Sequence, residues 1–124
     1  MSTEIRITIK DIIIAAELFD TVTARSVAAA LPLEAEPNEW GDEFYFEIPV
    51  RMPLDETATK KVSVGDIGYW PPGNALAIFF GPTPMSKNQE PVPASQVNIV
   101  GIITGDATIL RQAKGARVIR LERC

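Results

Sequence analysis

The sequence has 124 residues, 46% of them hydrophobic and 23% charged, which predicts one globular domain over residues 1–124. A formal net charge of −4 argues against nucleic acid as a partner, because nucleic-acid-binding proteins carry a basic face. The single cysteine, Cys124, excludes an internal disulfide, and the lack of histidine removes the commonest general base and metal ligand.

The hydrophobic residues form no membrane-spanning run. The longest apolar stretch, residues 12–19, is interrupted by Glu17 and is much shorter than the roughly 20 residues that cross a bilayer. Residues 1–6 lack the basic and apolar regions of a secretory signal. We therefore expect a cytoplasmic protein that does not enter the membrane.

The N-terminal part of the chain predicts a hairpin followed by a helix. Residues 5–9 alternate apolar and polar side chains, and Lys10-Asp11 makes a two-residue turn into a second strand over 12–19. An N-cap at Asp20-Thr21 begins a helix of small residues, which Pro32 ends.

Strands are expected throughout the middle of the chain. Four segments are rich in aromatic and β-branched residues, which favour strands; they span residues 43–48, 61–64, 67–70 and 75–80. Between the last two, residues 71–74 (PPGN) predict a tight reversal and therefore a second hairpin.

The C-terminal part combines a long loop with two strands and a short helix. Four prolines exclude ladder structure over residues 81–96, and long loops in compact domains are commonly functional. Residues 97–103 predict a buried strand, a helix runs from Asp106 to Lys114, and 117–121 predict the final strand. Many strands with two short helices indicate a closed barrel.

Three motifs and two shorter segments carry a family resemblance. They are residues 38–46 (NEWGDEFYF), 65–73 (GDIGYWPPG), 77–84 (AIFFGPTP), 93–95 (PAS) and 97–101 (VNIVG). In this order they resemble the small prokaryotic cyclophilin-like domain family. The resemblance covers nearly the whole chain and implies a mainly β fold, a closed cyclophilin-like barrel of about eight strands with two short helices. It leaves the activity open.

Prolyl isomerase activity is known in the wider fold, but its motif is missing here. The cyclophilin catalytic stretch reads Phe-His-Arg, whereas the nearest stretch in this chain, residues 46–50, reads FEIPV and places Glu47 where a cation is needed. Arg25 or Arg51 would have to reach the groove from elsewhere. We therefore expect no catalytic residues, no metal and no cofactor.

Carboxylates are the remaining candidates for chemistry. Asp42 and Glu43 follow Trp40 in the first motif, where they are either functional or simply an acidic turn before a strand. Asp66 follows Gly65, and an aspartate in this position is expected to hydrogen-bond its own turn backbone.

Aromatic residues in the motifs predict a ligand pocket, because small-molecule sites are mostly apolar and aromatic with a few polar groups. The predicted ligand-binding residues are Trp40, Tyr45, Tyr69, Trp70, Phe80, Thr83 and Asn98. We expect Tyr69 and Trp70 at the rim beside the 81–96 loop, and Phe79 in the core. Thr83 either contacts the ligand or braces its own turn.

Three hypotheses of function follow. The leading one is a non-enzymatic domain that binds a small molecule or peptide. The second is a prolyl isomerase with a relocated arginine. The third is an accessory or regulatory subunit, with a protein partner, of a multi-part amide-hydrolysing enzyme, since cyclophilin-like barrels resemble domains of such enzymes. An aromatic cleft without an inward arginine favours the first hypothesis, and an exposed apolar patch favours the third.

Overall fold

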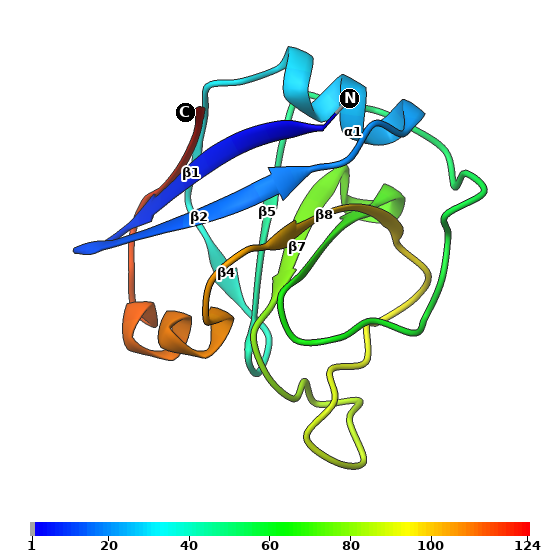
Figure 1. Ribbon diagram of the computed structural model, residues 1–124. Helices are drawn as coiled ribbons and strands as arrows, with labels where there is room; N and C mark the ends of the chain where they lie inside the picture. The colour runs from blue at the N-terminus through cyan, green and yellow to red at the C-terminus, as the bar shows by residue number, and fades with distance from the viewer. Residues whose placement is uncertain (1) are drawn as a thin grey trace.

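The computed structural model describes residues 2–124, which form one curled sheet of nine antiparallel strands with two short helices beside it (Figure 1). The strand order across the sheet is β3-β9-β1-β2-β8-β6-β7-β5-β4. The strands are β1 (Thr3–Ile9), β2 (Ile12–Leu18), β3 (Leu33–Ala35), β4 (Asn38–Glu39), β5 (Glu43–Glu47), β6 (Asp66–Trp70), β7 (Ala75–Phe79), β8 (Asn98–Ile103) and β9 (Ile119–Arg123). The predicted mainly β, cyclophilin-like fold class is confirmed, as a curled half-barrel of nine strands with β3 and β4 at its edges, where a closed barrel of about eight strands was expected.

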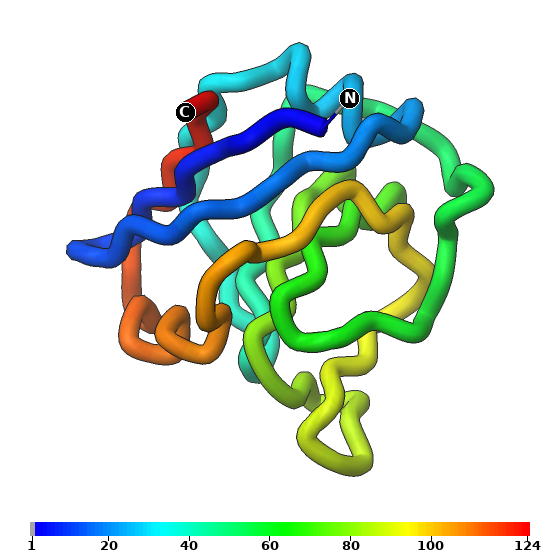
Figure 2. Tube along the Cα trace, viewed as in Figure 1, coloured from blue at the N-terminus to red at the C-terminus, as the bar shows by residue number. Residues whose placement is uncertain are grey.

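The two edges of the sheet lie next to each other in the sequence. β3 pairs with β9 and β4 pairs with β5, and only residues 36–37 separate the two strands. Figure 2 shows this cyan segment running from the red C-terminal strand toward the other end of the molecule. The sheet therefore curls until its two edges are consecutive parts of one segment.

The helices begin and end where the sequence indicates. α1 (Val22–Ala29) begins after Thr21, whose Oγ1 accepts a hydrogen bond from the Ala24 amide. η2 (Ala107–Ala113) is a 3-10 helix capped by Asp106, whose carboxylate accepts from Thr108 N. A further single turn of 3-10 helix, η1 (Pro71–Gly73), connects β6 to β7. None of the helices described in residues 2–124 is long and apolar enough to cross a membrane.

One predicted strand is wrong. Residues 61–64 lie in an irregular segment that leads into β6, and the amide of Ser63 donates to the Asp66 carboxylate at 2.8 Å rather than to a neighbouring strand. This bond is the local turn contact expected of Asp66. Val62 is nonetheless buried, which explains why its segment has the hydrophobicity of a strand.

Apolar residues pack on both faces of the β5–β7–β6 region. The main core lies inside the curl and includes Phe44, Phe46 and Tyr69. A smaller cluster of Val62, Ala77, Phe79 and Val97 lies on the outer face, with Tyr45 and Trp70 packed against it. Successive residues of a strand point to opposite faces, so these strands are buried on both sides and the outer face is covered by loops.

Candidate ligand-binding site

A cavity of about 180 Å³ lies on the outer face of β5, β7 and β6. Its lining residues are Trp40, Glu43, Tyr45, Trp70, Ala77, Phe79, Pro93, Ala94 and Val97. The first six come from the motifs in residues 38–46, 65–73 and 77–84, and the last three come from the segment leading into β8.

The strand register sets these side chains in rows across the sheet. Glu43 is the direct partner of Phe79, and on its other side the Trp40 amide donates to the Glu43 carbonyl at 3.0 Å. Glu43 therefore lies between Trp40 and Phe79. In the next row on the same face, Tyr45 is opposite Ala77, and directly opposed residues hold their Cβ atoms about 5 Å apart.

Small residues form the floor of the cavity. Ala77 lies between Tyr45 of β5 and Gly68 of β6, so the second row has almost no side-chain volume at its centre. A Cβ at residue 68 would be 2.7 Å from Val97 Cγ2, which means that only glycine lets Val97 rest on the sheet. The concavity follows from these two small residues between large aromatic ones.

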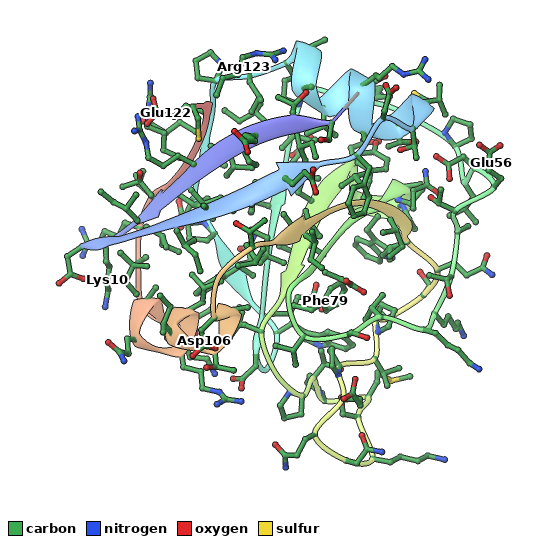
Figure 3. The ribbon with its side chains drawn as sticks, viewed as in Figure 1. Lys10, Glu56, Phe79, Asp106, Glu122 and Arg123 are labelled. Atoms are coloured by element: carbon green, nitrogen blue, oxygen red, sulfur yellow. The ribbon has the colours of Figure 1, made fainter. Side chains whose placement is uncertain are left out.

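The wall opposite the sheet is held by specific hydrogen bonds. The indole Nε1 of Trp70 donates to Ser95 Oγ at 2.6 Å, which fixes the segment containing Pro93 and Ala94. Val97 and Thr59 exchange two backbone hydrogen bonds of 3.0 Å. Phe79, labelled in Figure 3, lies beside the green loop that leads into β6, as its packing against Val62 requires.

Glu43 is the distinctive polar group of the cavity. The residue is 7% exposed, and its Oε1 atom has no hydrogen-bond partner among residues 2–124. Burial raises the pKa of this carboxyl from its ordinary value of 4.5 to about 8, because an apolar environment disfavours the charged form. Buried polar groups are nearly always paired, so the unpaired Oε1 of Glu43 distinguishes this cavity.

The neighbouring Asp42 has a structural role. Its carboxylate lies 2.7 Å from both Arg111 Nε and Lys114 Nζ, and it joins the β4–β5 turn to η2. Although burial opposes the effect, the hydrogen bonds from Lys114 and Arg111 hold the pKa of Asp42 below its ordinary value. The two adjacent carboxylates, which the sequence leaves equivalent, thus have different environments.

The structure brings three of the seven predicted ligand-binding residues together. Trp40, Tyr45 and Trp70 line the cavity, whereas Tyr69 is fully buried in the main core. The expectation that Tyr69 shares a rim with Trp70 is wrong, because consecutive residues of β6 point to opposite faces. The hydroxyl of Tyr69 donates to the Val50 carbonyl at 2.5 Å and thereby holds the loop after β5.

The other three predicted residues also have structural contacts elsewhere. Phe80 is fully buried and packs against Phe44 with ring centroids 4.7 Å apart. Thr83 is buried and its hydroxyl donates to the Val92 carbonyl, so it braces the base of the 81–96 loop.

Asn98 forms part of a buried hydrogen-bond network. Its amide donates to Thr23 Oγ1 at 3.0 Å and to the Pro53 carbonyl at 2.9 Å, and its carbonyl accepts from the Asp55 amide at 2.8 Å. This network ties α1 and the loop after β5 to β8. Asn98 is fully buried in this network and does not line the cavity.

The sequence does not indicate Phe79 as a residue of the site, and it does not decide whether Glu43 is functional. Phe79 was assigned to the core, and it is indeed fully buried, but it lies on the outer face and lines the cavity. The signal that could have found it is its period-2 spacing from Ala77 in β7, together with the pairing to β5 that puts it opposite Glu43.

The chain belongs to the cyclophilin-like family, whose model matches residues 3–122. No curated protein sequence matches it. A similar solved structure is that of the hypothetical protein AF2241 from Archaeoglobus fulgidus, with 34% identity, a TM-score of 0.82, and coverage of 99% of this chain and 95% of that one.

McbB, whose structure was solved in complex with tryptophan, is also similar, with 17% identity and a TM-score of 0.70. The match covers 96% of this chain and 44% of McbB, so the chain spans less than half the length of that protein. At this identity the similarity concerns the fold alone.

Proposed function

We propose that this cyclophilin-like domain binds a small molecule in the outer-face cavity. The observation that carries the proposal is Glu43, a buried residue that lines the cavity beside aromatic rings and whose carboxyl oxygen Oε1 has no hydrogen-bond partner among residues 2–124. Burying such a group costs free energy unless a partner satisfies it. A ligand that pairs with Glu43 would supply that partner.

The size and lining of the cavity support a small ligand. Its volume of about 180 Å³ is close to that of the roughly 150 Å³ apolar cavity that holds benzene. The space suits a small molecule or a single side chain of a peptide. McbB was solved with tryptophan, and this aromatic amino acid therefore belongs in any screen of ligands for the present chain.

The lining favours binding over prolyl isomerisation. The residues around the cavity include a glutamate and no arginine, whereas an isomerase of this fold class needs a cationic donor in its groove. Arg25 is paired with Asp20 at 2.8 Å, and Arg51 is exposed and outside the lining. The arrangement therefore fits a non-enzymatic binding domain.

The test uses the two tryptophans of the chain, because both line the cavity. A library of small aromatic and amine compounds, including tryptophan, is added to ¹⁵N-labelled protein while the two indole N–H resonances are followed by NMR. We expect some compounds to shift both resonances in a saturable manner. Saturable binding elsewhere on the protein, or no binding by any compound, would contradict the proposal.

A matched pair of variants locates the binding. Ala77→Leu fills the floor of the cavity without removing a wall, and Ile13→Ala changes a side chain that is 66% exposed on β2. Binding should be lost in the first variant and retained in the second. Unchanged binding by a folded Ala77→Leu protein would place the ligand outside the cavity.

A further inference from the structure

We propose that the ligand of this cavity is an organic cation, an ammonium group with alkyl substituents, held by the Glu43 carboxylate and the surrounding aromatic rings. The inference rests on the proposed function and names the class of ligand. It follows from the position of one acidic group among the aromatic side chains of Trp40, Tyr45, Trp70 and Phe79.

The register places the carboxyl where a cation would contact several rings at once. Glu43 has Trp40 on one side and Phe79 directly opposite on the other, and Tyr45 follows it on the same face of β5. An aromatic ring attracts a cation within about 6 Å of its centroid, and the attraction grows when the site excludes water. An alkylated ammonium group carries a positive charge and also has an apolar surface, which can pack against the aromatic and aliphatic side chains of the cavity.

Other classes of ligand fit the lining less well. A calcium ion needs about six to eight oxygen ligands, whereas the cavity offers one carboxylate among mostly carbon walls. The lining has no Lys or Arg side chain to attract an anion, and the ionised form of Glu43 would repel one. A neutral apolar compound would fill the space and leave the carboxyl unpaired, which is the costly arrangement already present in the empty cavity.

The charges near Glu43 are consistent with this assignment. Among the lining residues, all within the described part of the chain, Glu43 and Tyr45 are the titratable ones. β7 contributes Ala77 and Phe79, β6 contributes Trp70, and the covering segment contributes Pro93, Ala94 and Val97, all uncharged. The adjacent Asp42 is already paired with Arg111 and Lys114. A ligand cation therefore meets a single acidic group.

Binding of a cation should be coupled to release of a proton. Burial raises the pKa of Glu43 to about 8, so the carboxyl is mostly protonated at neutral pH in the free protein. A cation pairs with the ionised form and lowers that pKa. Affinity for a permanently charged ligand should consequently rise by about tenfold per pH unit below pH 8 and become constant above it.

The experiment compares choline with its neutral carbon analogue 3,3-dimethylbutan-1-ol, by NMR titration of the two indole N–H resonances between pH 6 and 9. The quaternary ammonium of choline keeps its charge over this range. We expect choline to bind at least tenfold more tightly than the alcohol at pH 8.5, and its affinity to fall toward pH 6. The alcohol should show little pH dependence.

Two variants on the same strand and face provide the control. Glu43→Gln keeps the shape of the side chain and removes its charge, whereas Glu47→Gln alters an exposed glutamate four residues further along β5. The preference for choline and its pH dependence should disappear in Glu43→Gln and persist in Glu47→Gln. A preference that survives Glu43→Gln would overturn the inference.

The outcomes also separate this inference from the proposed function. If library compounds bind in a manner sensitive to Ala77→Leu but choline binds no better than the alcohol, the cavity is a ligand site and the assignment of a cation is wrong. If no compound, choline included, is sensitive to Ala77→Leu, both the site and its ligand class are overturned.

Discussion

Tyr69 and Trp70 are neighbours in β6, yet their side chains lie on opposite faces of the sheet. Tyr69 is fully buried inside the curl, and its hydroxyl contacts the Val50 carbonyl and the Met52 amide. Trp70 lines the outer-face cavity and donates to Ser95. The pair therefore offers a direct comparison between an aromatic residue in the main core and one that lines the cavity.

Tyr69→Phe should destabilise the protein without altering the cavity. The change removes one hydroxyl and leaves the Val50 carbonyl and the Met52 amide without this partner. The free energy of unfolding should fall by about 1–3 kcal/mol, as measured by chemical denaturation. Choline affinity should stay within twofold of the wild-type value. A marked loss of affinity in a folded protein would mean that Tyr69 contributes to the site after all.

Trp70→Ala should have the opposite balance of effects. It removes an aromatic wall and the anchor for Ser95, so binding of any cavity ligand should weaken by about 1–3 kcal/mol, in the range of a binding hot spot. Because Trp70 is only partly buried, its loss should destabilise less than Phe46→Ala, for which about 3–5 kcal/mol is expected. Isothermal titration calorimetry would measure the loss of affinity in Trp70→Ala, and differential scanning calorimetry would compare the stabilities of Trp70→Ala and Phe46→Ala. An unfolded Trp70→Ala protein would assign the residue to the core.

Glu43→Gln should stabilise the free protein increasingly as the pH rises. The pKa of Glu43 is about 8 in the folded protein and 4.5 ordinarily, so between these values the unfolded chain loses a proton that the folded chain retains. The effect of Glu43 on the free energy of unfolding is therefore absent below pH 4.5. Between pH 4.5 and pH 8 this effect lowers the stability of the wild type progressively, and above pH 8 it is constant.

The measurement for this prediction is the difference in unfolding free energy between Glu43→Gln and wild type, determined by denaturation at pH 5 and pH 8. The difference should grow by about 2–4 kcal/mol over that interval. Glu47→Gln should show no such growth, because Glu47 is exposed. If the free energies of unfolding of Glu43→Gln and wild type changed with pH by the same amount, the raised pKa of Glu43 would be contradicted.

No prolyl isomerase activity above the uncatalysed rate is expected on a standard proline-containing peptide. The cavity has no arginine in its lining, and the stretch of the chain nearest to the isomerase motif carries Glu47 in place of a cation. A coupled peptide assay at high protein concentration would check this. Acceleration that is lost in Arg51→Ala would revive the isomerase hypothesis.

Most strands could be predicted from the sequence because period-2 alternation is a local property of the chain. The first hairpin is an example: β1 (Thr3–Ile9) and β2 (Ile12–Leu18) match the strands predicted over residues 5–9 and 12–19, although β1 begins two residues earlier, and Lys10-Asp11 forms the turn between them. The exception, residues 61–64, is hydrophobic because Val62 packs on the outer face. Val62 is buried although it lies in a loop and not in a β-strand. The pattern of apolar residues does not distinguish a buried loop from a strand.

The site was less predictable because its burial depends on distant segments. In β5, Glu43, Tyr45 and Glu47 occupy one face, which resembles an ordinary solvent-facing row. Glu43 is buried because Pro93, Ala94 and Val97, some fifty residues away in the sequence, cover this part of the sheet. Aromatic content alone likewise does not show which of Tyr69 and Trp70 faces outward, since both faces of β6 are covered.

The most direct test of the account is the titration of the Glu43 side-chain carboxyl by ¹³C NMR, with and without choline, using Glu47 in the same strand as an internal reference. We expect Glu43 to titrate with a pKa near 8 in the free protein and at a clearly lower pH when choline is bound, because the cation stabilises the carboxylate. A Glu43 carboxyl that titrates near 4.5 in the free protein, or whose titration choline does not change, would contradict the assignment of this cavity as a cation-binding site.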